Sequence, residues 1–185
     1  MTRILLVALL VLVAAPVSAQ TPAGELSAGW SFLRSLDAAS ADLGEFENFP
    51  LGFHVGGAGR ITDSFGIAGD LGWNRKTVSF EDIAELEVSF TSFSAGPRFY
   101  FGDRVTGFVH ALRGGIQLKA TGSFLGEQES ETATEFMIQP GGGVDIRVGD
   151  GFAVRLQGDY QWINAEDSDG NVRFVAAAVF YLGER

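Results

Sequence analysis

Apolar and polar residues alternate with a period of two along most of this chain, and this alternation constrains the fold more than any other feature. A β-strand turns successive side chains to opposite faces, so a period of two indicates strands with two chemically different faces. Eight stretches carry the pattern, and they cover residues 24–34, 51–60, 65–74, 88–101, 108–119, 135–148, 152–162 and 172–182. The chain is therefore predicted to be an all-β protein with eight strands.

The two faces of these stretches carry different kinds of residue. One face is rich in glycine and holds the charged side chains Arg60, Asp70, Arg98, Arg113, Asp145, Arg147, Arg155, Asp159 and Arg173. The opposite face is nearly free of charge and ends in aromatic residues, among them Trp30, Trp73, Phe101, Tyr160 and Trp162. A transmembrane barrel turns an apolar band with aromatic girdles to the lipid and a polar face to its lumen. This distribution predicts a transmembrane β-barrel whose lumen contains the charges.

Two details of the strands follow from the same alternation. In the stretch 108–119 it assigns His110 and Leu112 to the lipid face and Arg113 to the lumen. Pro97 and Pro140 fall inside strands and lack the N–H that a ladder needs, so each predicts a bulge or a local widening.

The connections between the stretches are alternately short and long. Short turns are predicted at Thr62, Asp103 and Asp150. The long connections are acidic, and they carry Asp37, Asp42, Glu45, Glu47, Glu81, Asp82, Glu85, Glu87, Glu127, Glu129, Glu131, Glu166, Asp167 and Asp169. Short periplasmic turns and longer extracellular loops are typical of barrels in the bacterial outer membrane.

The first 19 residues have the features of a secretion signal. Arg3 precedes an apolar run at 4–15, Pro16 ends that run, and Val17-Ser18-Ala19 offers small residues to a signal peptidase. We expect cleavage after Ala19, which leaves residues 20–185 as one barrel domain. The chain has no cysteine, and its formal charge of −10 disfavours nucleic acid as a partner.

Three segments make the chain resemble a known family. They are GFHVGGAGRITDSFGIAGDLG at 52–72, SAGPRFYF at 94–101 and QPGGGVDIRV at 139–148. With them the chain resembles the small outer-membrane β-barrel family that includes the OmpA transmembrane domain and OmpX-like proteins. The resemblance covers almost the whole mature chain and implies an eight-stranded antiparallel barrel with both termini in the periplasm. The expected partners are outer-membrane lipids, lipopolysaccharide, the barrel-assembly machinery and an extracellular ligand of the loops.

The chain departs from this family at its end. Residues 182–185 stand where the family commonly has a terminal aromatic residue that serves as the insertion signal, and Phe180 and Tyr181 are the nearest substitutes.

Residues that carry catalysis are scarce. His54 and His110 are the only histidines, and the topology places His54 inside the barrel and His110 at the interface just after a periplasmic turn. Neither position suits a Ser-His-acid triad at the extracellular rim. The segment EDSDG at 166–170 lacks the spacing of a calcium loop. We therefore assign no catalytic, cofactor-binding or metal-binding residue and expect a non-enzymatic protein.

Three functions fit these features. The first is a structural or surface-interaction role through acidic extracellular loops. The second is a small pore, although paired interior charges are expected to plug so narrow a lumen. The third is a soluble lipocalin-like lipid carrier, which requires the two faces of every strand to be exchanged.

Overall fold

The computed structural model describes residues 22–36, 47–80, 84–102, 105–124, 127–149, 151–164 and 170–184. The expected signal peptide, residues 1–19, lies outside this part of the chain and stays a prediction. The strands are β1 (Pro22–Ser35), β2 (Asn48–Phe49), β3 (Leu51–Arg60), β4 (Phe65–Phe80), β5 (Ala84–Phe101), β6 (Val105–Phe124), β7 (Glu127–Gly149), β8 (Phe152–Ile163) and β9 (Gly170–Glu184). A helix long and apolar enough to cross a membrane is not found among the described residues.

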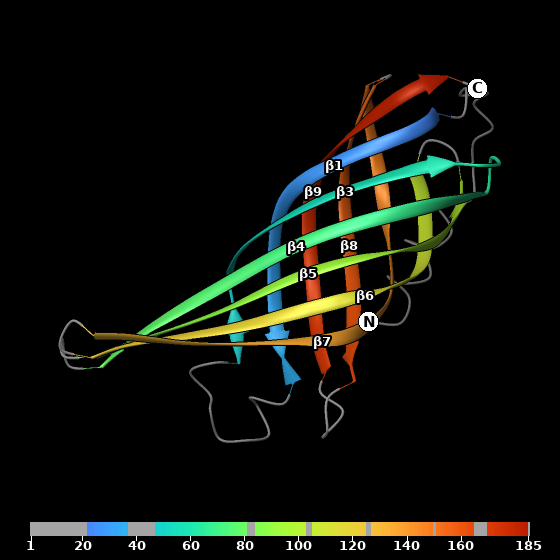
Figure 1. Cartoon of the computed structure of the whole chain (residues 1–185). Coiled ribbons are helices and arrows are strands. Elements are labelled where there is room, and N and C mark those ends of the chain that lie inside the picture. Colours follow the sequence, from blue (N-terminus) through green and yellow to red (C-terminus); the bar gives the residue numbers. More distant parts are fainter. Residues whose placement is uncertain are drawn as a thin grey trace, which may run out of the picture.

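The strands form one antiparallel sheet that closes on itself (Figure 1). The closing pair is β9 with β1, and their ladder runs from Pro22 opposite Glu184 to Ser35 opposite Asn171. β2 and β3 both pair with β1 and are separated only by Pro50, which has no N–H for the ladder. They therefore act as one strand, and the predicted eight-stranded antiparallel barrel is confirmed.

The two ends of the barrel differ. At one end residues 61–64 join β3 to β4, three residues separate β5 from β6, and two separate β7 from β8. β1 begins and β9 ends at this same end, which we name the turn end. The opposite end, where β1 ends and β9 begins, is named the loop end.

Two hairpins extend past the rest of the barrel at the loop end (Figure 1). β4 pairs with β3 only as far as Arg75 opposite Leu51, and β7 pairs with β8 only up to Met137 opposite Ile163. Beyond these pairs β4, β5, β6 and β7 continue, paired with one another. We name this part the protruding sheet, and it comprises residues 76–80, 84–89, 117–124 and 127–136.

The protruding sheet corrects the expectation of four long loops. Five acidic residues assigned to loops lie on strands instead: Glu85, Glu87, Glu127, Glu129 and Glu131. On β5 Glu85 and Glu87 alternate with Leu86 and Val88, but the apolar residues here lie on the lumen side, the reverse of the arrangement in the rest of the strand. Residues 127–135 of β7 are polar except for Ala133 and show no such alternation. Of the other loop acids, Glu47 forms an ion pair with Arg34. The rest, Asp37, Asp42, Glu45, Glu81, Asp82, Glu166, Asp167 and Asp169, lie outside the described residues.

The two strand prolines interrupt pairing without shifting it. The described ladders lack pairs between β5 and β6 at Gly96 and Pro97, and between β7 and β8 at Gln139 and Pro140. The register is the same on both sides of each gap, so of the two expected irregularities a bulge is not found at either proline, and the missing pairs correspond to a local widening. The register shift of β7 lies instead between Arg147 and Gly149, next to a turn.

The predicted division between lumen and outer wall holds on every barrel strand except β6. There Leu112 is 0% exposed and His110 5%, whereas Arg113 is exposed, so the predicted faces of β6 are wrong. The lumen of an eight-stranded barrel is filled by side chains, and β6 supplies apolar ones. Its large apolar residues therefore face inward, and the smaller Val109 and Ala111 face outward.

The outer wall carries exposed large apolar side chains on all sides, for example Leu71, Phe99, Leu156 and Phe180. A soluble carrier of lipocalin type needs the opposite arrangement, with the apolar face inside. The structure therefore contradicts that alternative.

Candidate functional site

Arg173 is fully buried in the lumen and binds two carboxylates. Its Nε and Nη2 donate to Asp159 Oδ2 at 3.0 and 2.6 Å, and its Nη2 also donates to Asp70 Oδ2 at 2.9 Å. Arg173 Nη1 lies 2.8 Å from Asp70 Oδ1. The three residues come from β9, β8 and β4, so this cluster ties together walls of the barrel that are distant in sequence. Paired guanidinium and carboxylate groups of this kind form the strongest hydrogen bonds in proteins.

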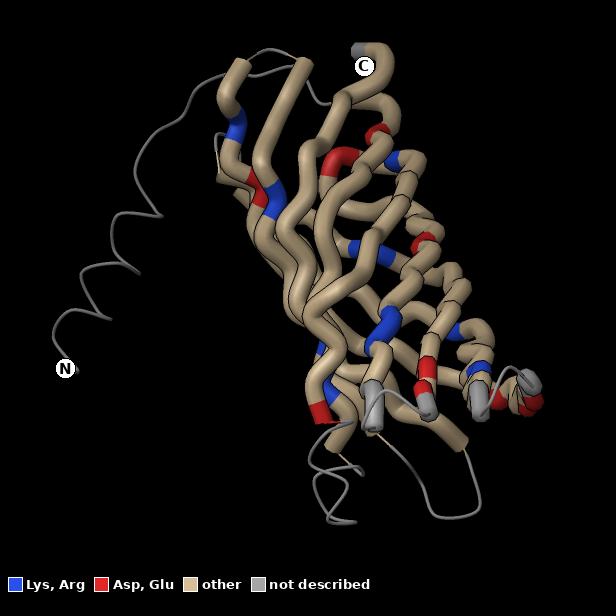
Figure 2. The backbone as a smooth tube through the Cα atoms, turned by 90° about the vertical axis from the view of Figure 1, so that its left-hand side faces the viewer, with Lys and Arg blue, Asp and Glu red and all other residues tan. Residues whose placement is uncertain are grey.

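Glu25 holds a second cluster nearer the turn end. Arg98 Nη1 and Arg155 Nη2 donate to Glu25 Oε1 at 2.7 and 2.6 Å. Arg155 also forms a two-point contact with Asp145, in which Nε donates to Oδ1 and Nη2 to Oδ2, both at 2.7 Å. Figure 2 shows the charged residues distributed over several levels and strands of the barrel. Glu25 is not among the predicted lumen charges, although it alternates in step with Ser27 and Ser31 and so belongs to the lumen face.

His110 connects the two clusters. Its Nδ1 lies 3.4 Å from Arg98 Nη2, and its Nε2 lies 3.0 Å from Asp159 Oδ1. Two guanidinium groups lie over the ring of Phe108, with Arg98 at 4.5 Å and Arg155 at 4.6 Å from its centre. Polar contacts thus continue through the lumen from Asp145 to Asp70. The interfacial position predicted for His110 is wrong because Asp159 on β8 gives it a partner inside the barrel.

The predicted interior position of His54 is confirmed, and its neighbours follow the order of a catalytic triad. Ser27 Oγ lies 3.0 Å from His54 Nε2, and His54 Nδ1 lies 3.1 Å from Asp70 Oδ2. The three side chains are nevertheless buried, with 3% exposure at Ser27 and 1% at His54. Asp70 also binds Arg173, so its charge already has a partner. A substrate outside the barrel does not reach this hydroxyl, and the contacts serve to hold three strands together.

Arg113 is the one predicted lumen charge that the structure places elsewhere. Arg60, Asp70, Arg98, Asp145, Arg155, Asp159 and Arg173 are all buried inside the barrel. Arg147 is half-buried, with its guanidinium 4.8 Å from the ring of Tyr181. Arg113 faces outward, with its guanidinium 5.9 Å from the ring of Phe136. Within the described part of the chain, no group of three or more His, Asp or Glu side chains is arranged to hold a metal ion.

Apolar side chains close the lumen above the charges. Ile116, Met137 and Ile163 form a buried cluster toward the loop end, and Phe90 packs against it. Phe49 from β2 contacts Phe90 edge to face, with ring centres 4.9 Å apart. The lumen therefore consists of a charged, mutually neutralised part and an apolar layer above it.

The protruding sheet is the other candidate site, because it offers a face and an edge outside the barrel. One face is continuous with the lumen and carries Val78, Leu86, Val88 and Leu118, which are half-buried or exposed. The opposite face is polar and carries Thr77, Glu87, Ser89, Lys119, Thr121, Ser130, Thr132 and Thr134. Among the described residues, β7 has no strand partner on its β8 side before Met137.

Comparison with known proteins places the chain in a family. The family described as the outer membrane protein β-barrel domain matches residues 5–181. No curated protein matches the chain.

Solved structures of small barrels show the same fold. The attachment invasion locus protein Ail of Yersinia pestis, solved with the heparin analogue sucrose octasulfate, is 18% identical with a TM-score of 0.64 over 85% of this chain and 96% of Ail. Neisserial surface protein A is 12% identical with a TM-score of 0.58, over 86% of this chain and 96% of its own. The N-terminal barrel of Pseudomonas aeruginosa OprF is 16% identical with a TM-score of 0.50, over 87% of this chain and all of its own. In barrels of the bacterial outer membrane the short turns face the periplasm and the longer connections face the exterior, which orients the turn end and the loop end. The chain belongs to the outer-membrane β-barrel family, and its place is the bacterial outer membrane.

Proposed function

We propose that this protein is a non-enzymatic surface protein whose barrel holds the protruding sheet at the cell exterior for contact with a partner. The observation that carries this proposal is the length of β7. A tilted strand crosses a membrane with about 9–11 residues, and β7 has 23. Residues 127–136 of β7 lie beyond its last pair with β8. At about 3.3 Å per residue, ten residues correspond to roughly 30 Å of strand.

The free edge of β7 supports an interaction role. An unpaired strand edge presents backbone N–H and C=O groups, and an extended segment of another protein can add to it as a further strand. Exposed charges on such an edge prevent indiscriminate pairing and select the partner. Here the edge carries Glu129, Glu131 and Glu135, which are all exposed. The partner that this edge fits is an extended segment with lysine or arginine at alternate positions.

The same charges disfavour a polyanion at this edge. Ail was solved with a heparin analogue, which is a sulfated polyanion. On this chain such a ligand would meet the three glutamates of the β7 edge, and like charges at close range raise the free energy of binding. The barrel fold that this chain shares with Ail is therefore compatible with partners of different charge in the two proteins.

Binding of a synthetic strand peptide tests the proposal. The probe is a peptide of alternating lysine and valine, titrated against the purified protein in bilayer nanodiscs and followed by fluorescence anisotropy. The triple variant Glu129→Gln, Glu131→Gln, Glu135→Gln should bind it about ten-fold more weakly or worse, because each ion pair contributes about 0.2–1 kcal/mol. The control is Glu87→Gln, which removes a carboxylate from the protruding sheet away from the β7 edge.

A variant with a shortened β6–β7 hairpin tests the β7 edge separately from the rest of the surface. Lys119 lies opposite Thr132, so residues 120–131 can be replaced by Asn-Gly, which favours a two-residue hairpin turn. This variant should lose peptide binding. Equal binding by the shortened and wild-type proteins, or binding of heparin in preference to the cationic peptide, would contradict the proposal.

A further inference from the structure

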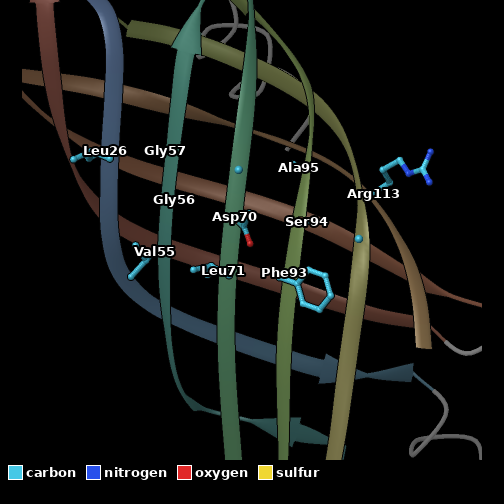
Figure 3. A pocket seen from close by; sticks show the side chains of 12 residues that line it. Leu26, Val55, Gly56, Gly57, Asp70, Leu71, Phe93, Ser94, Ala95 and Arg113 are labelled. Atoms are coloured by element: carbon cyan, nitrogen blue, oxygen red, sulfur yellow. The ribbon is translucent and has the colours of Figure 1, made fainter. Parts of the chain in front are cut away.

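A groove of about 530 Å³ lies on the outer wall of the barrel and crosses β3, β4, β5 and β6 (Figure 3). Its floor is made by small residues on adjacent strands, since Gly57 is paired with Gly69 and Gly69 with Ala95. The next residue in this row is Arg113, which is paired with Ala95. The groove volume falls within the range of about 300–1,000 Å³ that is usual for small-molecule sites.

The walls of the groove are apolar and face the membrane. One side of the groove is lined by the next row of paired residues toward the loop end, which consists of Val55, Leu71 and Phe93. Leu26 closes the end opposite Arg113. These four side chains are 44–54% exposed in the isolated chain. A depression with such walls on a lipid-facing surface suits a hydrocarbon chain.

The two ends of the groove lie at different depths in the membrane. Barrel strands are tilted relative to the barrel axis, so a row of paired residues runs obliquely from one end of the barrel to the other. Beyond Arg113 the row continues through Ile138 to Trp162, which pairs with Gly170 at the start of β9, at the loop end. Beyond Leu26 it continues to Phe180 opposite Phe152, next to a turn at the other end. Arg113 therefore marks the extracellular end of the groove.

Arg113 is a cation on the outer wall of an acidic chain. Among the described residues, no carboxylate lies within ion-pair distance of its guanidinium, which lies 5.9 Å from the centre of the Phe136 ring. The other arginines of the outward face differ, because Arg34 is paired with Glu47 and Arg75 with Glu87. A guanidinium on a lipid-facing wall is costly unless it reaches the interface or an anion. Its fork of donors matches a phosphate.

We propose that this groove binds one lipopolysaccharide molecule of the outer leaflet. A phosphate of its lipid A accepts hydrogen bonds from Arg113, and an acyl chain lies along Gly57, Gly69 and Ala95 toward Leu26. Gly57 and Gly69 keep this space open, because larger side chains at these positions would occupy the volume of the acyl chain. This binding involves the membrane-embedded wall and is independent of the function proposed for the protruding sheet.

The glycines allow the groove to be filled without disturbing the barrel. A Cβ added at Gly69 would have its nearest neighbour at 4.0 Å, so Gly69→Leu fits the backbone and fills the floor. A Cβ added at Gly59 meets nothing within 4 Å. Gly59 is on the outer wall of the same hairpin but outside the groove, which makes Gly59→Leu the matched control.

The test is native mass spectrometry of the purified protein in detergent micelles, titrated with bis-phosphorylated lipid A. Folding of each variant is checked first by its migration on unheated gels. We expect one lipid A per barrel for the wild type, and binding about ten-fold weaker or worse for Arg113→Gln, because the neutral amide cannot form the charge-assisted hydrogen bonds of a guanidinium to a phosphate. Gly69→Leu should weaken binding as strongly, and Arg113→Lys should restore part of it. Ala95→Leu replaces Gly69→Leu if the latter does not fold.

Three comparisons can overturn the proposal. Lys119→Gln removes an exposed cation of the same strand, and Gly59→Leu adds the same bulk, so a loss as large in either control contradicts a specific site. Equal binding of lipid A without its phosphates contradicts the role of Arg113. Equal binding of phosphatidylglycerol contradicts the assignment to lipopolysaccharide.

Discussion

Leu112 and Arg113 are neighbours on β6 and face opposite environments, the filled lumen and the lipid wall. Truncation of Leu112 to alanine leaves a cavity that no solvent or lipid fills, so Leu112→Ala should lower the free energy of unfolding by about 2–5 kcal/mol. Leu156→Ala on the outer wall, where Leu156 is 52% exposed, should cost much less because lipid fills the space. Urea titration of barrels folded into vesicles measures both. Equal losses of stability in Leu112→Ala and Leu156→Ala would indicate that Leu112 faces the lipid.

Glu25 is a single carboxylate that serves two buried guanidinium groups. Glu25→Gln removes that charge and leaves Arg98 and Arg155 less well neutralised, so it should cost about 3–5 kcal/mol of stability. The control is Glu87→Gln, because the ion pair of Glu87 with Arg75 is about 40% exposed on both sides. A pair of that kind contributes about 0–1 kcal/mol. A Glu25→Gln barrel as stable as the control would show that the lumen network does not depend on Glu25.

At this scale the alternation of the sequence predicts which face a residue occupies, but not its partner. Glu25 and Arg155 are 130 positions apart and meet only because the barrel closes. Nothing local distinguishes Arg113 from the interior arginines either. On β6 the lumen face is the more apolar one, so the rule that charge marks the lumen gives the wrong answer there.

The strands themselves were predictable where lipid surrounds them and not beyond it. Within the membrane one face must be apolar and the other polar, so β8 and β9 show the alternation clearly and their predicted ranges are close to the observed ones. In the protruding sheet water surrounds the strands. Residues 127–134 are therefore predicted as part of an acidic loop, although they continue β7.

The protruding part of the β6–β7 hairpin should therefore be separable from the barrel. Replacement of residues 120–131 by Asn-Gly removes paired residues that lie outside the lumen network and the apolar layer. We expect the shortened barrel to fold into vesicles and to change in stability by less than about 2 kcal/mol, because the removed residues whose burial the structure describes, 120–122 and 129–131, are small or polar. Folding is followed by gel migration and stability by urea titration. Failure of this variant to fold would make the protruding sheet part of the folding core.

For the whole molecule, the charges and the apolar layer together decide whether the barrel conducts ions. An eight-stranded barrel is only wide enough to be filled by its own side chains. Here Arg98, Arg155 and Arg173 are each bound to carboxylates, and Ile116, Met137 and Ile163 lie above them. Ions that cross such a lumen must displace paired charges and then an apolar layer, and both steps are costly.

We therefore predict that the purified protein shows no steady single-channel current in a planar bilayer. Asp145→Ala removes one carboxylate from Arg155 and should lower stability in urea before it changes conductance, because Glu25 still holds the guanidinium in place. Met137→Ala thins the apolar layer and tests whether that layer alone is the barrier. If the wild type shows reproducible open channels whose ion selectivity changes on replacement of Arg98, the lumen is a pore and the charges line it. If only Met137→Ala conducts, the apolar layer is the seal and the charged part beneath it is already permeable to ions.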